Sequence, residues 1–192
     1  MAQTRAALVA AGRTLFGRDG FAATSVEDLA REARVTTGAL YHHFPTKTKL
    51  FEAVFMTAHD QLIAAATSAA AGAPNEVESL GRAFDSFLDA MLEPDLRHIV
   101  VVDAPAVLGL ARFTELDERY AVTGIVAALD AAVASGRLAV AEPETLARLL
   151  LGSLTRGAML IANSPEPGKT RDEVASTMRA MLAGFAASPG SR

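Results

Sequence analysis

The hydrophobic positions of this chain recur mostly at intervals of three and four residues, which is the spacing of an amphipathic helix. Over residues 3–18 they form one stripe, and Gly20 follows where a left-handed residue can end the helix. No alternation of apolar and polar residues runs long enough to indicate a sheet strand. The pattern predicts an all-α protein.

Residues 24–44 predict two short helices joined by a tight turn. Thr24 and Glu27 have the spacing of a capping box at the start of the first of them. Thr36 is placed to cap the second, which Pro45 ends. A helix this short is not stable alone, so we expect its neighbours to hold it and present it as a surface. Two helices in this arrangement form a helix-turn-helix.

The next helix is expected to start at Thr46 and to carry Lys47 and Lys49 in its first turn. The positive end of the helix dipole disfavours cations there by about 0.3–1 kcal/mol each. A phosphate group would reverse this cost, because it would meet both the free amides and the lysines. The alternative is that the two side chains extend into water. Beside a helix-turn-helix, we adopt the phosphate interpretation.

The middle of the chain predicts more helices, separated by glycine and proline. The helix from Thr46 is expected to continue to about residue 71, and the next to start with Asn75 and Glu78. The β-branched run 96–102 could suggest a strand. No partner strand is near it in the sequence, so a short buried helix is predicted instead.

The C-terminal half predicts a kink and three longer helices. The kink falls after Asp103, and the helix that follows it is expected to end at Gly109. The first of the longer helices is expected to start with Thr114 and Asp117 and to end at Gly136. The second is expected over residues 142–163, and the third is expected to start with Thr170 and Glu173.

Composition restricts the class of protein. The 192 residues are 51% hydrophobic, which is enough for a packed core. No apolar run approaches the roughly 18 residues needed to cross a bilayer, and the N-terminus lacks the pattern of a signal peptide. The chain has no cysteine, which excludes disulfides, thiolate metal sites and a cysteine nucleophile. We expect a soluble, cytoplasmic protein.

The net charge of −4 is distributed unevenly along the chain. Residues 1–50 hold seven lysines and arginines against four acidic residues, a balance of +3, so the other 142 residues carry −7. Such asymmetry suggests a head that binds a polyanion, attached to an acidic body.

The run 21–54, and above all GALYHHFPTKTKLFEAV from Gly38, resembles the DNA-binding head of TetR-family transcriptional regulators. In that family a helix-turn-helix is followed by a lysine at the start of a long connecting helix. The matching positions of this chain are Thr24, Gly38, Leu40, Tyr41, Phe44, Lys47 and Leu50. The resemblance implies a three-helix DNA-binding domain over residues 1–50, joined by a long fourth helix to a helical ligand-binding and dimerisation domain over residues 51–192.

The resemblance also implies which residues touch DNA. Some would approach base edges, others would lie at the edge of the groove, and Thr24, His43 and Lys47 would hold phosphates. The expected DNA-binding residues are Thr24, Thr36, Thr37, Gly38, Tyr41, His42, His43 and Lys47. Each has a structural alternative, such as a helix cap for Thr24 or a partly buried position for His43. Hydroxyl groups read bases less decisively than arginine or asparagine, so no operator sequence is predicted.

The last two predicted helices are apolar, and in TetR-like proteins two such helices from each subunit form a four-helix bundle. The alternative is that both faces only complete the core of one subunit. The residues expected at a homodimer interface are Leu146, Leu150, Leu154, Ile161, Val174, Met178, Met181 and Phe185. A dimer would present two recognition helices to a palindromic operator.

A small-molecule pocket in the central helices is a further implication of the resemblance. The aromatic, flexible and polar residues expected on its walls are Phe55, Phe84, Phe87, Met91, His98, Val101, Phe113, Tyr120 and Met159. Any one of them could equally be ordinary core. His98 and Asp103 are the polar groups expected to orient a ligand, which must prefer one of two conformations to change DNA affinity. We expect the fourth helix to transmit this change as a tilt.

The predicted function is therefore a transcriptional repressor, not an enzyme, that a small hydrophobic or amphipathic ligand releases from double-stranded DNA. No cofactor, metal or membrane is expected. One alternative is a constitutive or architectural DNA-binding protein without a ligand. Another is a helical-bundle enzyme, which is disfavoured because His42 and His43 diverge on a helix and the other histidines lack a partner at ligand spacing. The effector and the direction of its effect are left open.

Overall fold

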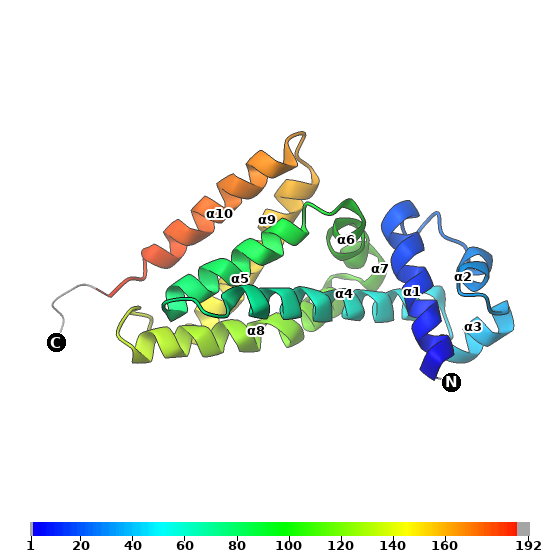
Figure 1. Ribbon diagram of the computed structural model, residues 1–192, viewed down its shortest axis with the longest axis horizontal. Helices are drawn as coiled ribbons and strands as arrows, with labels where there is room; N and C mark the ends of the chain where they lie inside the picture. Colours follow the sequence, from blue (N-terminus) through cyan, green and yellow to red (C-terminus); the bar gives the residue numbers. More distant parts are fainter. Residues whose placement is uncertain (1, 188–192) are drawn as a thin grey trace. The chain divides into compact units, whose positions relative to one another are not determined.

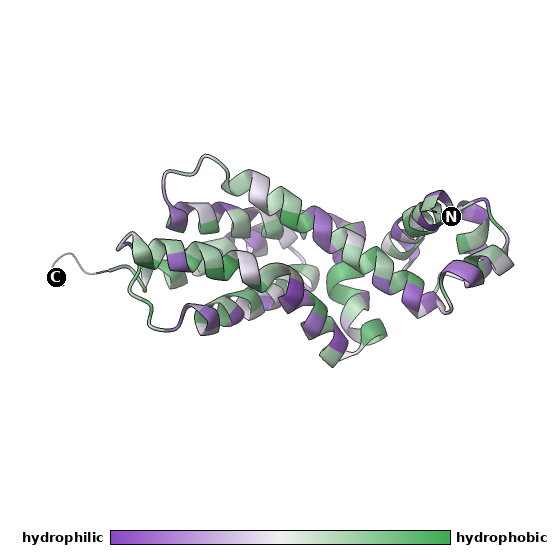
Figure 2. Cartoon of the chain, turned by 90° about the horizontal axis from the view of Figure 1, so that it is seen from below, coloured by the Kyte–Doolittle hydropathy of each residue, from purple (hydrophilic) through white to green (hydrophobic). Residues whose placement is uncertain are grey.

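The computed structural model describes residues 2–187, with the side chain of Tyr120 left out, and is helical almost throughout (Figure 1). Within the described residues the only β feature is an isolated bridge between Leu138 and Ala186. The prediction of an all-α protein is confirmed. The helices carry both hydrophobic and hydrophilic residues, as amphipathic packing requires (Figure 2).

The chain forms two compact units. The first comprises Met1–Asp60 and Glu93–Thr114, and the second comprises Gln61–Leu92 and Glu115–Arg192. The unit that contains the helix-turn-helix therefore also includes residues 93–114. The domain boundary predicted at residue 50 places these residues in the C-terminal domain.

The first unit is built around three N-terminal helices and the start of a fourth. Their bounds are α1 Ala2–Asp19, α2 Val26–Glu32, α3 Thr37–His43 and α4 Lys47–Ala70. The second segment adds α6 Pro94–Arg97, the π-helix η1 His98–Asp103, α7 Ala104–Leu108 and the first residues of α8 Leu110–Ala134. The rings of Phe16, Phe21 and Phe51 contact one another at centroid distances of 5.3 to 5.6 Å. Phe16 and Phe51 are fully buried at the centre of this unit.

Glycines set the end of α1 and its contact with α6. Gly20 has a φ of 82°, so it ends α1 in the left-handed region as predicted. A Cβ atom on Gly17 would lie 2.8 Å from Asp95 Cβ. Only glycine at residue 17 lets α1 and α6 approach this closely.

The β-branched run after α6 is helical, as predicted, but part of it is a π-helix. Ile99, Val100 and Val101 are buried in η1, and the Ala104 N–H donates to the Ile99 carbonyl five residues earlier. Pro105 follows and has no N–H to donate, so an α-helical ladder would be interrupted here in any case. Gly109, with a φ of 78°, ends α7 as expected.

The second unit contains the rest of α4 and α8 together with α5 Glu76–Ala90, α9 Pro143–Ala162 and α10 Pro167–Ala183. Asn75 caps α5 as predicted, since its side chain accepts a hydrogen bond from the Glu78 N–H at 2.9 Å. α9 and α10 pack against each other, and both contact α5. The core of this unit includes Leu88, Leu129 and Leu150, all fully buried.

Three predicted helix starts are wrong. The cap of α2 is Ser25 and not Thr24, because the Ser25 side chain accepts from the Asp28 N–H. α8 begins at Leu110 directly after Gly109, and not at Thr114 with Asp117. α10 begins at Pro167 and not at Thr170 with Glu173. A proline at the first helical position is already set to a helical φ, so α10 needs no hydroxyl cap.

By length and composition α9 could cross a membrane. This is weak evidence, since 44% of its most apolar 18-residue stretch is buried inside the protein, as in the core helix of a soluble domain.

Candidate nucleic-acid interface

The turn between α2 and α3 is fixed by backbone hydrogen bonds. The Val35 N–H donates to the Ala30 carbonyl at 2.9 Å and the Arg34 N–H to the Arg31 carbonyl at 3.1 Å, which is the Schellman arrangement. Arg34 takes the left-handed position with a φ of 56°. Thr36 then caps α3 as predicted, accepting from the Ala39 N–H at 3.1 Å. The helix-turn-helix follows from these local contacts.

α3 has a buried side and an exposed side. Leu40 is fully buried and Phe44, which follows the helix, is 4% exposed. The exposed side carries four residues expected to meet DNA, Thr37, Gly38, Tyr41 and His42, while His43 is half-buried. A Cβ atom on Gly38 would meet only Thr36 Oγ1, at 3.9 Å, so packing within the protein does not require this glycine.

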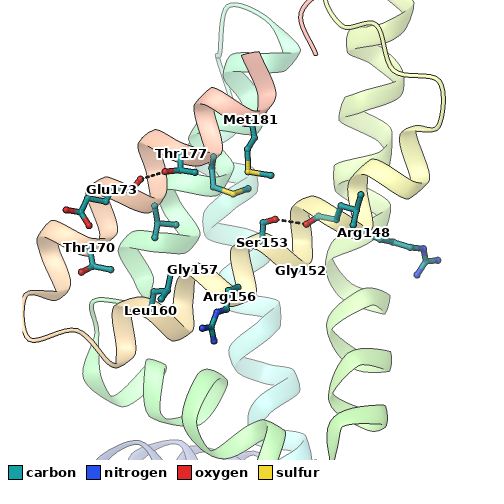
Figure 3. A pocket seen from close by; sticks show the side chains of 13 residues that line it. Arg148, Gly152, Ser153, Arg156, Gly157, Leu160, Thr170, Glu173, Thr177 and Met181 are labelled. Atoms are coloured by element: carbon teal, nitrogen blue, oxygen red, sulfur yellow. Dashed lines mark hydrogen bonds between the residues drawn. The ribbon is translucent and has the colours of Figure 1, made fainter. Parts of the chain in front are cut away.

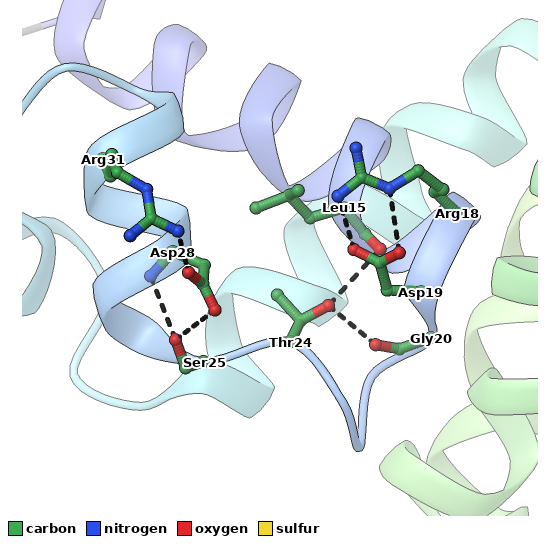
Figure 4. A network of polar contacts seen from close by, with 8 residues as sticks. All are labelled: Leu15, Arg18, Asp19, Gly20, Thr24, Ser25, Asp28 and Arg31. Carbon is green, nitrogen blue, oxygen red and sulfur yellow. Dashed lines mark hydrogen bonds and ion pairs between the residues drawn. The ribbon is translucent and has the colours of Figure 1, made fainter.

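Thr24 does not fit the expectation that it holds a phosphate. It is buried, and its hydroxyl lies 2.7 Å from the Gly20 carbonyl and 3.3 Å from the Leu15 carbonyl (Figure 4). These contacts direct the hydroxyl into the protein. Ser25 occupies the helix start in its place, and the spacing of Ser25 and Asp28 in the sequence was the signal that could have identified it.

The lysines at the start of α4 have partners within the protein. Lys47 Nζ donates to the Phe21 carbonyl at 2.8 Å and to the Thr24 carbonyl at 2.9 Å, and it lies 4.1 Å from the centre of the Phe21 ring. Lys49 Nζ donates to Glu52 at 2.8 Å. Neither cation therefore requires a phosphate to offset the helix dipole, and the contact of Lys47 with DNA stays a prediction.

Glu52 joins the start of α4 to the start of α8. Its carboxylate accepts from Lys49 and also from Arg112 Nε, at 3.0 Å. The hydrogen bond from Lys49, followed by that from Arg112, lowers the pKa of Glu52 below its usual value. The carboxylate is thus ionised and supports the base of the helix-turn-helix.

Arginines at the edge of this surface supply positive charge that the sequence analysis did not assign to DNA. Arg31 and Arg34 are both exposed, in and beside the turn before α3. Arg31 forms an ion pair with Asp28, whereas Arg34 extends from the left-handed turn position. Arg5 of α1 lies over the Phe44 ring at 5.2 Å. A cationic border beside an exposed polar helix suits a phosphate backbone.

Comparison with known proteins supports this arrangement. Residues 8–54 match the family described as bacterial regulatory proteins, tetR family, and residues 77–185 match the tetracyclin repressor-like C-terminal domain. The second match covers more than half of the chain. This chain belongs to the TetR family. It is a DNA-binding transcriptional regulator.

Three proteins illustrate how far this TetR-family chain resembles others. A TetR-family regulator from Pectobacterium atrosepticum is 32% identical in its crystal structure, covers 98% of this chain and 97% of its own, and has a TM-score of 0.88. The Tn10 TetC protein of Escherichia coli is 24% identical over 93% of this chain and 90% of its own. RolR in complex with resorcinol is 18% identical, covers 100% of this chain and 96% of its own, and has a TM-score of 0.77, which indicates the fold alone.

The residues expected in a ligand pocket are divided between the two units of this TetR-family regulator. Phe55, His98, Val101 and Phe113 belong to the first, and Phe84, Phe87, Met91 and Met159 to the second. Tyr120 belongs to the second by its position, but its side chain lies outside the described residues. In the first unit Phe55 packs on Phe113 at a centroid distance of 5.9 Å and on His59 at 4.4 Å. The pocket stays a prediction.

Two polar groups expected to orient a ligand have another role here. Asp103 Oδ2 accepts a hydrogen bond from the Phe21 N–H at 2.6 Å. His98 lies 4.0 Å from the same carboxylate oxygen and packs against Gly20. Asp117 is a polar group that the sequence pattern did not indicate. Burial raises its pKa to about 6, and its carboxylate accepts a hydrogen bond from the Thr155 hydroxyl at 3.2 Å. This pair lies in the second unit.

Five of the eight residues expected at a dimer interface face the core. The buried residues are Leu146, Leu150, Leu154 and Ile161 of α9 and Met178 of α10, so the expectation for these five is wrong. The opposite face of α9 exposes Leu149 by 64% and Leu160 by 46%. Together with Val174 and Met181 of α10, these residues line an open groove of about 760 Å³ between the two helices (Figure 3).

Proposed function

We propose that this regulator is a repressor that binds a palindromic operator as a homodimer and leaves it when a small hydrophobic or amphipathic molecule binds. The observation that carries the proposal is the exposed side of α3. Thr37, Gly38, Tyr41 and His42 are free of the core while Leu40 anchors the helix. A helix of this kind enters the major groove and offers its polar side chains to base edges.

The residues on and beside the exposed side of α3 suit both the recognition of base edges and the contact with phosphates. The Thr37 and Tyr41 hydroxyls can donate and accept hydrogen bonds, and the His42 ring has one nitrogen for each role when neutral. Gly38 keeps the backbone free of a side chain where the helix would approach the bases. Arg31 and Arg34 would meet phosphates beside the groove.

The outer face of α9 and α10 supports the homodimer. Leu149 and Leu160 are large apolar side chains directed away from the core, and Gly152 between them adds no side chain to the groove. A twofold axis through this face would pair it with itself, because a twofold interface uses the same patch on both subunits. The bundle so formed would contain α9 and α10 of each protomer.

The ligand part of the proposal draws on a related fold. RolR, a protein of related fold, has a crystal structure in complex with resorcinol, which is a small amphipathic phenol. The second unit of this chain holds the buried aromatic and thioether side chains of Phe84 and Met91, and Asp117 with Thr155 as a polar pair. Such a mixture of apolar walls and few polar groups suits a small amphipathic molecule.

Selection of DNA from a random-sequence pool by the full-length protein tests the proposal. The enriched duplex should contain two half-sites related by a twofold axis, with centres roughly 10 base pairs or somewhat more apart. Thr37→Ala should relax the preference at one position of each half-site, by about 1–3 kcal/mol of discrimination. Enrichment of no sequence, or of a single half-site bound by a monomer, would contradict it.

A further inference from the structure

Both peptide groups of Phe21 are held by side chains from distant parts of the first unit. Its N–H donates to Asp103 Oδ2 at 2.6 Å, and its carbonyl accepts from Lys47 Nζ at 2.8 Å. Asp103 ends the π-helix η1, and Lys47 begins α4. We call this pair of hydrogen bonds the Phe21 bridge. It connects two segments more than fifty residues apart through one residue of the loop after α1.

The side chain of Phe21 restricts the loop further. Its ring contacts Phe16 of α1 at 5.6 Å and Phe51 of α4 at 5.4 Å, and Lys47 Nζ lies 4.1 Å from its centre. The residue before it is Gly20, where a Cβ atom would lie 3.0 Å from two atoms of the His98 ring. A movement of this loop would therefore break one or more of these contacts.

The position of the loop determines where α2 begins. Lys47 Nζ also donates to the Thr24 carbonyl at 2.9 Å, and the next residue, Ser25, caps α2. α2 in turn leads through the Schellman turn into α3. A change at Phe21 is thus carried to the helix that is proposed to read DNA.

We propose that Asp103 is a positioning residue that sets DNA affinity through the Phe21 bridge without touching DNA. The proposal rests on the proposed DNA-binding function. It assigns to Asp103 an effect opposite to that of its charge, because removing an anion from a DNA-binding head should by electrostatics alone strengthen binding.

Asp103→Leu and Asp103→Asn separate these effects, since both remove the charge but only asparagine keeps an oxygen that can accept from the Phe21 N–H. The bridge predicts that Asp103→Leu weakens binding to the selected duplex by about tenfold and that Asp103→Asn restores most of the loss. Equal affinities for the two variants, or stronger binding by both, would overturn the role of Asp103.

Amide hydrogen exchange at Phe21 tests the bridge without DNA. Protection of this amide should fall at least about tenfold in Asp103→Leu and be retained in Asp103→Asn, with protection of core amides of α1 unchanged. If the wild type bound no duplex, the proposed DNA-binding function would be wrong, whereas amide hydrogen exchange would still show whether the bridge exists. Unchanged protection in Asp103→Leu would show that it does not.

Discussion

Gly157 of α9 lies so close to Val174 of α10 that a Cβ atom on the glycine would be 2.6 Å from Val174 Cγ1. Real Cβ atoms do not approach this closely, so Gly157→Ala must push the two helices apart or force Val174 from its rotamer. We expect a loss of about 1–2 kcal/mol in the free energy of unfolding, after the gain in helix propensity is included.

Gly124→Ala is the control for this prediction, because nothing lies within 4 Å of a Cβ atom at residue 124 of α8. It should gain up to about 1 kcal/mol from helix propensity. Urea unfolding followed by circular dichroism measures both variants. If Gly157→Ala proves as stable as Gly124→Ala, the close contact between α9 and α10 does not exist.

Leu149→Glu tests the proposed dimer face. A charge at this position would be buried in the interface without a partner, so the dimer dissociation constant should rise by about a hundredfold or more. Leu110→Glu is the control, since Leu110 is 74% exposed and belongs to the first unit. Sedimentation equilibrium should show a monomer for Leu149→Glu and a dimer for Leu110→Glu. The same state for both would exclude this face.

Arg34 has a positive φ, which a side chain makes costly by about 1–2 kcal/mol. Arg34→Gly removes that cost but adds chain entropy to the unfolded state, so we expect a net gain of about 0.5–1 kcal/mol in stability. Arg34→Ala removes the same charge and keeps the Cβ atom, so it should bring no gain. Thermal unfolding compares them, and equal melting temperatures for the two variants would contradict the left-handed turn.

Local signals in the sequence were sufficient for most helix ends. Asn75, Thr36 and Gly20 act within one turn of their own helix, so their roles depend on neighbouring residues alone. Thr24 and Ser25 could not be separated in this way, because each is followed three residues later by an acidic residue. The choice between them depends on the burial of Thr24, which tertiary packing decides.

Non-local contacts explain the errors at the candidate site. The sequence shows that Lys47 is a cation at a helix start, but not that two backbone carbonyls from the loop after α1 lie beside it. Similarly, α9 has leucines on two faces. Periodicity identified the stripe through Leu150, and only the packing of α5 and α10 shows that Leu149 lies on the outer face.

Asp117 should make the protein less stable as pH rises. Burial raises its pKa to about 6 from 3.8, so its protonated form is favoured in the folded state. The stability that comes from the protonated form is complete below the unfolded-state pKa of 3.8 and is lost as the pH rises through about 6. Asp117→Asn should therefore add about 2–3 kcal/mol to the free energy of unfolding at pH values above about 7 and almost nothing near pH 4. The asparagine can still accept the hydrogen bond from Thr155. An equal effect at both pH values would contradict the burial of the charge.

His59 acts in the opposite direction in the first unit. It is 4% exposed, and burial lowers its pKa to about 4 from 6.5. Above pH 6.5 the histidine is neutral in both the folded and the unfolded protein, so it does not reduce the free energy of unfolding. As the pH falls below 6.5, the unfolded chain binds the proton first. The free energy of unfolding therefore decreases until the pH reaches the folded-state pKa. The expected loss is about 3 kcal/mol between those two pH values, and His59→Gln should remove it. Urea unfolding across this range measures the slope. The same acid sensitivity in His59→Gln would assign it to other groups.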